Sequence, residues 1–240
     1  SADEQRELAE DLLPFWRGKT VEDDLNERMP EDVALDMDKY IFTMILEITY
    51  GVGHFTLDHE RLLKKGCVGI ADEARARMSA ISGNSAADEE KRLFYDAVVR
   101  SVNAAVKFAN RYAEAASKLA DAETDSERSA ELRDISRICR RVPEHPPESF
   151  HEAVQFVYFM HLISQIETGG NSISLGRIDQ YLYPYYEKDI REGRVTPERA
   201  RELLSLLCLK TNEIWNVLEE AFIPGGEGPD RKLFQTPHFW

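Results

Sequence analysis

The sequence has few basic residues for its length, and it has no long hydrophobic run. Its 240 residues include 44 acidic and 30 basic side chains, which gives a formal net charge of −14. Because clustered Lys and Arg bind a phosphate backbone and carboxylates repel it, this balance disfavours nucleic acid as a partner. No run approaches the roughly 18 consecutive apolar residues that a membrane-spanning helix needs. We therefore expect neither a nucleic-acid nor a membrane partner.

The sequence also lacks the signals of an exported or disulfide-bonded protein. Its first residues, SADEQRELAEDLL, are charged, whereas a signal peptide has a basic start and an apolar centre. Cysteine is scarce: Cys67, Cys139 and Cys208 are an odd number at wide spacing, and no two form a C-x-x-C pair. A disulfide framework and a structural zinc site are both disfavoured. These observations predict a cytoplasmic protein without a metal site.

What the sequence does contain is apolar material, 42% of its residues, in helical periodicity. From Asp88 to Ala120 the apolar positions fall three or four residues apart, which predicts a long, alanine-rich amphipathic helix. A helix that opens at Glu148 or Ser149 is apolar on nearly every face and is expected at the centre of the fold. Further helices are expected at residues 56–66, with Thr56 as N-cap and Gly66 as stop, and at 68–80, 129–141 and from 196 onward, with Thr196 as N-cap.

The remaining segments predict fewer regular elements. Residues 1–50 are interpreted as a helix, a linker broken by Pro14, Gly18 and Pro30, and the apolar run Tyr40–Tyr50, which must be buried as helix or strand. The alternating segment NSISLGR predicts a short buried strand near Ser172–Leu175. The fold class is therefore mainly α with a few strands.

Two short segments carry polar residues that core packing does not require. In G-V-G-H-F-T-L-D-H, two glycines allow a close backbone approach, and His54 precedes a predicted helix. A lone loop histidine is more often a surface or core residue than a ligand, by roughly three to one. In E-T-G-G-N-S-I-S-L-G-R, Asn171 and Ser172 follow a buried helix. They are either internal hydrogen-bonding groups or polar contacts of a pocket, and the residues alone leave these alternatives equal.

The charged and sulfur-containing residues near these segments have ordinary structural interpretations. Arg177 and Asp179 stand two residues apart, and a structural ion pair is favoured for them. Cys67 is expected to be a small buried hydrophobe by about five to one, since free cysteine is among the most buried residue types. Cys139 and Cys208 are likewise expected in the core. A nucleophilic Cys67 remains an alternative, which would need a nearby base and a lowered thiol pKa.

Several sequence blocks stand in an order that matches one known family. They are W-R-G-K-T (16–20), G-V-G-H-F…L-L-K-K-G (51–66), R-I-C-R-R-V-P-E-H-P-P-E-S-F-H-E-A-V-Q (137–155), F-M-H-L-I-S-Q-I-E (159–167), S-I-S-L-G-R-I-D-Q-Y-L-Y-P-Y-Y (172–186) and K-T-N-E (210–213). Together they resemble the N-terminal part of the glycyl radical enzymes, more narrowly the branch of glycerol dehydratases and pyruvate formate-lyase-like proteins.

This resemblance implies part of a ten-stranded β/α barrel and anaerobic lyase or dehydratase chemistry on a small polar substrate. A radical SAM activating enzyme would install a glycyl radical, which a cysteine relays to the substrate; no bound cofactor is expected, and a homodimer is compatible with the family. In the dehydratase branch the His of the G-H segment and the polar pair before S-L-G-R approach the substrate's hydroxyls. The resemblance therefore nominates His54, Asn171 and Ser172 as substrate-binding residues. Asn171 stands where glycerol dehydratase-like members have His, which argues against glycerol.

The family's Gly-Cys loop and its glycyl radical segment have no counterpart in this sequence. Gly66-Cys67-Val68 matches the former in letters only, because it lies at the end of the L-L-K-K-G helix. We therefore assign no catalytic residue. We expect a partial domain of the family at residues 1–223 and an irregular tail at 224–240 that does not match the family pattern. The chain is then a fragment, a truncated gene product or a degenerate relative. A decarboxylase, a carbon–sulfur lyase or a C-acetyltransferase remains open within the family. A non-catalytic helical scaffold or interaction protein is the alternative outside it.

Overall fold

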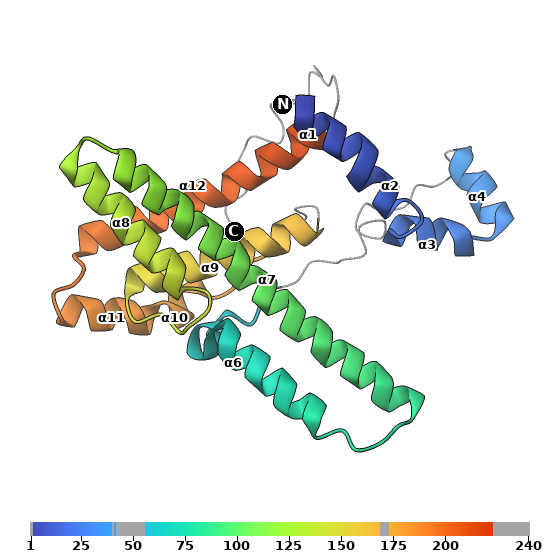
Figure 1. Cartoon of the computed structure of the whole chain (residues 1–240), viewed down its shortest axis with the longest axis horizontal. Helices are drawn as coiled ribbons and strands as arrows, with labels where there is room; N and C mark the ends of the chain where they lie inside the picture. Colours follow the sequence, from blue (N-terminus) through green and yellow to red (C-terminus); the bar gives the residue numbers. More distant parts are fainter. Residues whose placement is uncertain (1, 40, 42–55, 169–172, 223–240) are drawn as a thin grey trace.

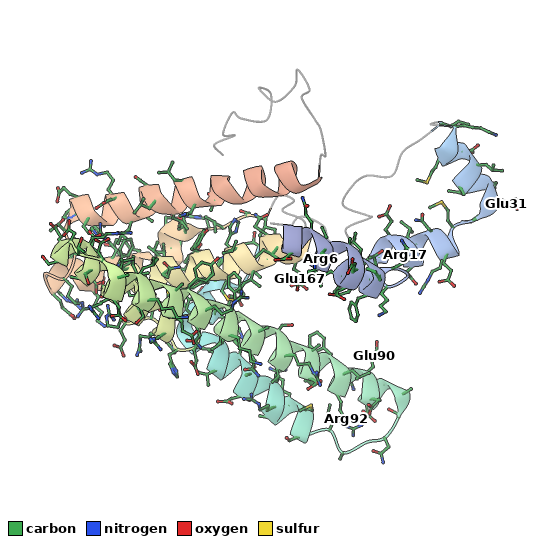
Figure 2. The ribbon with its side chains drawn as sticks, turned by 45° about the horizontal axis from the view of Figure 1, so that its top comes forward. Arg6, Arg17, Glu31, Glu90, Arg92 and Glu167 are labelled. Carbon is green, nitrogen blue, oxygen red and sulfur yellow. The ribbon has the colours of Figure 1, made fainter. Side chains whose placement is uncertain are left out.

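The computed structural model describes residues 2–39, 41, 56–168 and 173–222, and within these ranges the chain is helical (Figure 1). At the N-terminus, α1 (Ala2–Glu7), the π-helical turn η1 (Leu8–Leu12) and α2 (Leu13–Trp16) follow one another directly. Two short helices come next, α3 (Val21–Arg28) and α4 (Glu31–Asp38). In both views α3 and α4 extend away from the larger helices (Figures 1 and 2). The apolar residues of the first elements, including Leu12 and Phe15, are exposed.

The two helices α3 and α4 correct the prediction of a linker in this region. Thr20 begins α3 with a capping box: its hydroxyl accepts a hydrogen bond from the Asp23 amide (3.1 Å), and the Asp23 carboxylate accepts one from the Thr20 amide (3.0 Å). This reciprocal pair satisfies two free amides, so a helix can begin here without an apolar face to bury. Ile41 is exposed, and the rest of the run Tyr40–Tyr50 lies outside the described residues.

The larger body consists of longer helices. These are α6 (His59–Ser79), α7 (Ala86–Ala122), α8 (Ser126–Arg141), α9 (Phe150–Thr168), α10 (Ile178–Tyr181), α11 (Tyr183–Arg191) and α12 (Pro197–Phe222). Helix α7 pairs with α6 over one half of its length and with α8 over the other (Figure 1). Arg92 closes the α6–α7 turn by donating to the carbonyl oxygens of Ile81 (3.2 Å) and Gly83 (Figure 2). None of the helices in the described ranges is long and apolar enough to cross a bilayer.

Helix α9 forms the centre of this body, as its sequence predicts. It lies between α12 on one side and α7 and α8 on the other, and it also contacts α6 and α11 (Figures 1 and 2). Phe150, Phe156 and Phe159 are almost completely buried. Each fully buried aromatic side chain contributes about 2–3 kcal/mol through loss of water contact. The central position of α9 fixes where the segments at its two ends can lie.

Two buried carboxylates hold the N-terminus of α9. Asp189 of α11 accepts a hydrogen bond from the Phe150 amide (2.7 Å) and pairs with Arg194 (2.5 Å). Glu152 accepts a hydrogen bond from the Glu148 amide (2.7 Å) and pairs with Arg137 (3.0 Å). Carboxylates near a helix start also interact favourably with the helix dipole. These contacts anchor α9 to both α8 and α11.

Gly66 interrupts α6, where the sequence predicted one helix to stop and another to begin. Its backbone has φ +65° and ψ 170°, which a glycine adopts without strain. The amides of Cys67 and Val68 then donate to the carbonyl oxygens of Pro143 (2.9 Å) and Glu144 (3.0 Å). A Cβ atom on Gly66 would lie 2.5 Å from the Glu144 carbonyl oxygen. The kink of α6 at Gly66 is therefore docked closely against the turn between α8 and α9.

The predicted strand near Ser172–Leu175 is not present among the described residues. In its place is an isolated parallel β-bridge between Thr56 and Ser174, and no barrel is visible in the described part of the chain. The predicted alternation does hold, since Ile173 is buried and Ser174 is exposed. Thr56 is not the N-cap of α6 either: Asp58 takes that position, and its carboxylate accepts a hydrogen bond from the Arg61 amide (3.0 Å).

Candidate functional site

The site begins where the two polar segments singled out by the sequence come together. Thr56, which precedes α6, pairs with Ser174, which follows α9. The nominated residues His54, Asn171 and Ser172 lie outside the described residues, so their placement stays a prediction. Thr56 stands two positions after His54, and Ser174 stands two positions after Ser172. The structure therefore brings the two segments together at their described ends.

Gly176 allows a close approach at this crossing. Its φ is +68°, and a Cβ atom at this position would lie 2.8 Å from Cγ2 of Thr56. The Gly176 amide donates a hydrogen bond to the Ser174 hydroxyl (3.1 Å), which tightens the turn. Only a residue without a side chain fits this conformation and this distance without strain. The glycine of the S-L-G-R block is thus required by the local backbone conformation and by the close approach of Thr56.

Tyr181 of α10 contacts the same turn. Its hydroxyl donates a hydrogen bond to the carbonyl oxygen of Leu175 (2.7 Å), the residue directly after Ser174. Burial raises the pKa of Tyr181 well above its usual range, so the phenol keeps its proton and remains a donor. The ring lies against that of His59, with centroids 5.2 Å apart and planes inclined by 32°. Tyr181 therefore contacts both segments of the crossing.

His59, the first residue of α6, is 2% exposed and neutral. Burial and, to a lesser extent, the neighbouring imidazole of His161 lower its pKa to about 4, while Asp58 acts in the opposite direction. Neither ring nitrogen of His59 has a hydrogen-bond partner within the described structure. Unpaired buried polar atoms are costly, which marks this cluster as unusual.

His161 of α9 belongs to the same buried cluster. Its Nε2 lies 3.1 Å from the Gln165 amide nitrogen. The tautomer of the ring decides which of the two side chains donates in this contact, and Nδ1 of His161 has no hydrogen-bond partner within the described structure. Burial lowers the pKa of His161 as well. The buried cluster of His59, His161 and Gln165 is therefore uncharged, and the described residues include no group of three or more His, Cys, Asp or Glu side chains that could hold a metal ion.

The charged pair beside the crossing lies at the surface. Arg177 donates to both carboxylate oxygens of Asp179, at 2.9 and 2.8 Å, which confirms the predicted ion pair. Both side chains are exposed, so the pair is a surface ion pair. Thr56, Ser174 and Gly176 are exposed as well. The crossing is therefore accessible to a small molecule, while the buried histidine cluster is not.

The cysteines separate into two buried residues and one exposed residue. Cys67 and Cys139 are buried, as predicted, and burial raises their thiol pKa values to about 12 and about 11. These shifts count against Cys67 as a nucleophile, since the thiolate is the reactive form. The prediction that Cys208 lies in the core is wrong. Helix α12 buries Ala200, Leu203 and Leu207, and one further residue turns Cys208 to the exposed side.

Four residues of the site were not nominated from the sequence: His59, His161, Gly176 and Tyr181. A local signal existed for Gly176, because a glycine directly after an alternating segment is typical of a tight turn. For His59 and Tyr181 the sequence carries no such signal. Their contact joins the start of α6 to α10. Only the tertiary arrangement reveals it.

Comparison with known proteins gives consistent matches over most of the chain. The family model described as "Pyruvate formate lyase-like" matches residues 1–235. An isethionate sulfite-lyase from Oleidesulfovibrio alaskensis is 38% identical over 212 residues, which are 84% of this chain and 26% of the relative. A (2S)-3-sulfopropanediol dehydratase from Klebsiella oxytoca is 34% identical over 212 residues, covering 88% of this chain and 26% of the relative.

A solved structure agrees with these sequence matches. The glycerol-bound form of the B12-independent glycerol dehydratase from Clostridium butyricum superimposes with a TM-score of 0.78 at 35% identity. The match covers 88% of this chain and 26% of that structure. The chain thus spans about a quarter of the length of the proteins it matches.

Proposed function

Since the chain belongs to the glycyl radical enzymes of the pyruvate formate lyase-like family and corresponds to their N-terminal portion, we propose that it supplies part of the substrate pocket of a radical lyase or dehydratase. The observation that carries this proposal is the Thr56–Ser174 bridge. It joins the two segments that the family resemblance nominates for substrate binding. The substrate is a small polar molecule with at least one hydroxyl group.

The proposed roles follow from residue chemistry. His54, Asn171 and Ser172 offer hydrogen-bond donors and acceptors that can orient hydroxyl groups. An imidazolium at His54 can assist the loss of a hydroxyl as water by giving it a proton. The neutral buried cluster of His59, His161 and Gln165 would keep the pocket wall free of fixed charge. Such a wall suits orientation of a substrate by hydrogen bonds.

The radical step is proposed for a complete enzyme. There, a glycyl radical installed by a radical SAM activating enzyme would be relayed through a cysteine to the substrate. Cys67 and Cys139 are poor candidates for that relay, because both thiols are buried in the helical body. The part played by this chain is to bind and orient the substrate.

The relatives suggest which substrates to test. Their names indicate isethionate, (2S)-3-sulfopropanediol and glycerol as substrates of those proteins. All three carry a hydroxyl group on a short carbon chain. Asn171 in place of His favours a substrate other than glycerol, so the two sulfonates are the first compounds to test.

The test uses the complete reading frame that contains this sequence, expressed anaerobically with a radical SAM activating enzyme. We expect a glycyl doublet in electron paramagnetic resonance and turnover of one of the three compounds, followed by nuclear magnetic resonance. His54→Ala and Ser172→Ala should keep the doublet and lose turnover by about 100-fold or more, the usual contribution of a positioned proton donor. His145→Ala, an exposed histidine on the turn before α9, is the matched control and should change neither signal.

Three outcomes would contradict the proposal. One is a complete enzyme that forms no glycyl radical. Another is full turnover by both His54→Ala and Ser172→Ala. The third is a glycyl doublet on the isolated 240-residue chain, which would place the radical residue within it. A non-catalytic helical scaffold would give no turnover of any substrate under these conditions.

A further inference from the structure

We infer that Tyr181 is a positioning residue, which holds the two substrate-binding segments in register through the carbonyl oxygen of Leu175. This inference rests on the proposed function, because it assigns Tyr181 a task at the same pocket. The supporting contact is the 2.7 Å hydrogen bond from the Tyr181 hydroxyl to Leu175. Leu175 directly follows Ser174, the residue that pairs with Thr56. A shift of this carbonyl group would therefore also displace Ser174 and disturb the bridge.

His59 fixes the direction of the Tyr181 ring. The two rings lie 5.2 Å apart, and His59 is itself held at the first turn of α6, just after the N-cap Asp58. Because His59 is 2% exposed, its ring cannot turn away into solvent. The phenol is thus oriented by the α6 segment and bonded to the segment after α9. The Tyr181 side chain therefore contacts both of the segments that meet at Thr56 and Ser174.

Besides the apolar packing of Leu57, Ile173 and Leu175, few contacts within the described part of the chain hold the crossing. Among the described residues the backbone pairing is a single isolated bridge, and Thr56, Ser174 and Gly176 are exposed. The bond from Gly176 to Ser174 acts within one segment and does not join the two. The Tyr181 hydroxyl is therefore well placed to limit how far the 173–176 turn moves relative to α6. Loss of that hydroxyl should affect the pocket more than the helical body.

A simpler interpretation is that Tyr181 only fills space beside the core. The variant Tyr181→Phe distinguishes the space-filling role from the positioning role, because it keeps the ring and removes the hydroxyl. Tyr185→Phe is the matched control: Tyr185 also donates to a backbone carbonyl, that of Leu63, at 3.4 Å, but this contact lies away from the bridge. His59→Phe is a third variant, which keeps a ring against Tyr181 and removes the unpartnered nitrogens.

The first measurement is amide hydrogen exchange of the 240-residue chain. We expect exchange at residues 173–177 to be at least tenfold faster in Tyr181→Phe, with exchange in α7 and α9 unchanged. Tyr185→Phe and His59→Phe should leave residues 173–177 as in the original chain. Unchanged exchange at 173–177 in Tyr181→Phe, or equal acceleration in Tyr185→Phe, would overturn the inference.

The second measurement is the kinetics of the complete activated enzyme. Tyr181→Phe should raise KM about tenfold and leave the yield of glycyl radical unchanged, while Tyr185→Phe keeps the original KM. An unchanged KM in Tyr181→Phe would overturn the positioning role while leaving the proposed function standing. If instead His54→Ala and Ser172→Ala retain full turnover, the proposed function fails, and the inference about substrate positioning fails with it even where the exchange result holds.

Discussion

Thr56 and Ser174 form a parallel β-bridge that joins the segment before α6 to the segment after α9. The bridge depends on Gly176, whose positive φ turns the chain away immediately after Leu175 and leaves room for the Thr56 methyl group. It is also linked, through the hydrogen bond from Tyr181 to Leu175, to the contact between the rings of His59 and Tyr181. Local backbone geometry and buried ring packing therefore support one crossing from two sides.

Gly176→Ala should destabilise this crossing more than an ordinary glycine substitution. An alanine there has a strained backbone and a Cβ atom 2.8 Å from Cγ2 of Thr56. We expect a loss of about 3 kcal/mol in the free energy of unfolding, from strain and overpacking together. Gly193→Ala is the matched control, because Gly193 has the same φ of +68° and no atom within 4 Å of its Cβ position. Its expected loss is about 1 kcal/mol.

Urea unfolding followed by circular dichroism would measure both glycine variants. Equal losses in Gly176→Ala and Gly193→Ala would show that the contact with Thr56 carries no energy. A larger loss at Gly176, accompanied by faster amide exchange at residues 173–177, would confirm that the close approach stabilises the bridge.

The cysteines should differ strongly in their reactivity toward an alkylating reagent at neutral pH. Cys208 is exposed on α12, whereas Cys67 and Cys139 are buried with pKa values raised to about 12 and about 11. We expect one fast modification at Cys208, and labelling of the other two only after unfolding, because thiolate content and access both control the rate. Mass spectrometry of peptides after timed labelling measures this. Rapid modification of Cys67 in the folded chain would reinstate it as a candidate nucleophile.

The stability of the chain should fall as the pH is lowered from about 6.5 toward 4, in part because of His59. Its pKa is lowered from 6.5 to about 4 on folding, since burial disfavours the imidazolium. Between these values the unfolded chain binds more protons than the folded chain, so acid favours unfolding. The full effect of this residue is about 3 kcal/mol, complete near pH 4.

His59→Phe provides the comparison for this pH dependence. It removes the titrating group and keeps an aromatic ring against Tyr181. Urea midpoints measured from pH 7 to pH 4 should decline less steeply in the variant than in the original chain. Some decline should persist, because burial lowers the pKa values of His151 and His161 too. Identical slopes in the two proteins would show that His59 does not titrate as its burial implies.

Much of the helical architecture could be predicted from local sequence patterns. The alanine spacing of α7, the Thr196–Pro197 start of α12 and the stop at Gly66 are all confirmed. Each rests on residues close together in the chain, where periodicity, capping and backbone freedom decide the outcome. Helix α3 was missed although its start also carries a local signal. The Thr20–Asp23 capping box indicates a helix, but the glycine and prolines around it favoured the prediction of a linker.

The candidate site was less predictable because its contacts are not local. The polar segments around His54 and Ser172 could be nominated from the sequence, but the Thr56–Ser174 bridge could not, since alternation predicts a strand and does not name its partner. The exposed position of Cys208 was missed for a related reason. An apolar-looking helix face can be placed to within about one residue from sequence, and one residue rotates a side chain by about 100°.

The contact between Asp189 and the start of α9 should be more sensitive to substitution than the surface ion pairs of the helical body. Asp189 is buried, accepts a hydrogen bond from the Phe150 amide (2.7 Å) and pairs with Arg194 (2.5 Å). Asp189→Asn keeps the size and one acceptor oxygen but leaves Arg194 without its buried partner. We expect a loss of about 2 kcal/mol in the free energy of unfolding, because a buried Asn can no longer accept charge-assisted hydrogen bonds from both the Phe150 amide and the half-exposed Arg194.

Glu192→Gln is the matched control, because Glu192 pairs with the same Arg194 from a partly exposed position. Surface pairs contribute little, so its expected effect is below about 1 kcal/mol. Both variants would be compared by urea unfolding at pH 7, with amide exchange at residues 150–154 as the local readout. Exchange there should accelerate in Asp189→Asn alone, since only Asp189 bonds to the first amide of α9. Equal destabilisation by the two substitutions would show that the buried hydrogen bond to Phe150 adds nothing beyond the charge of the pair.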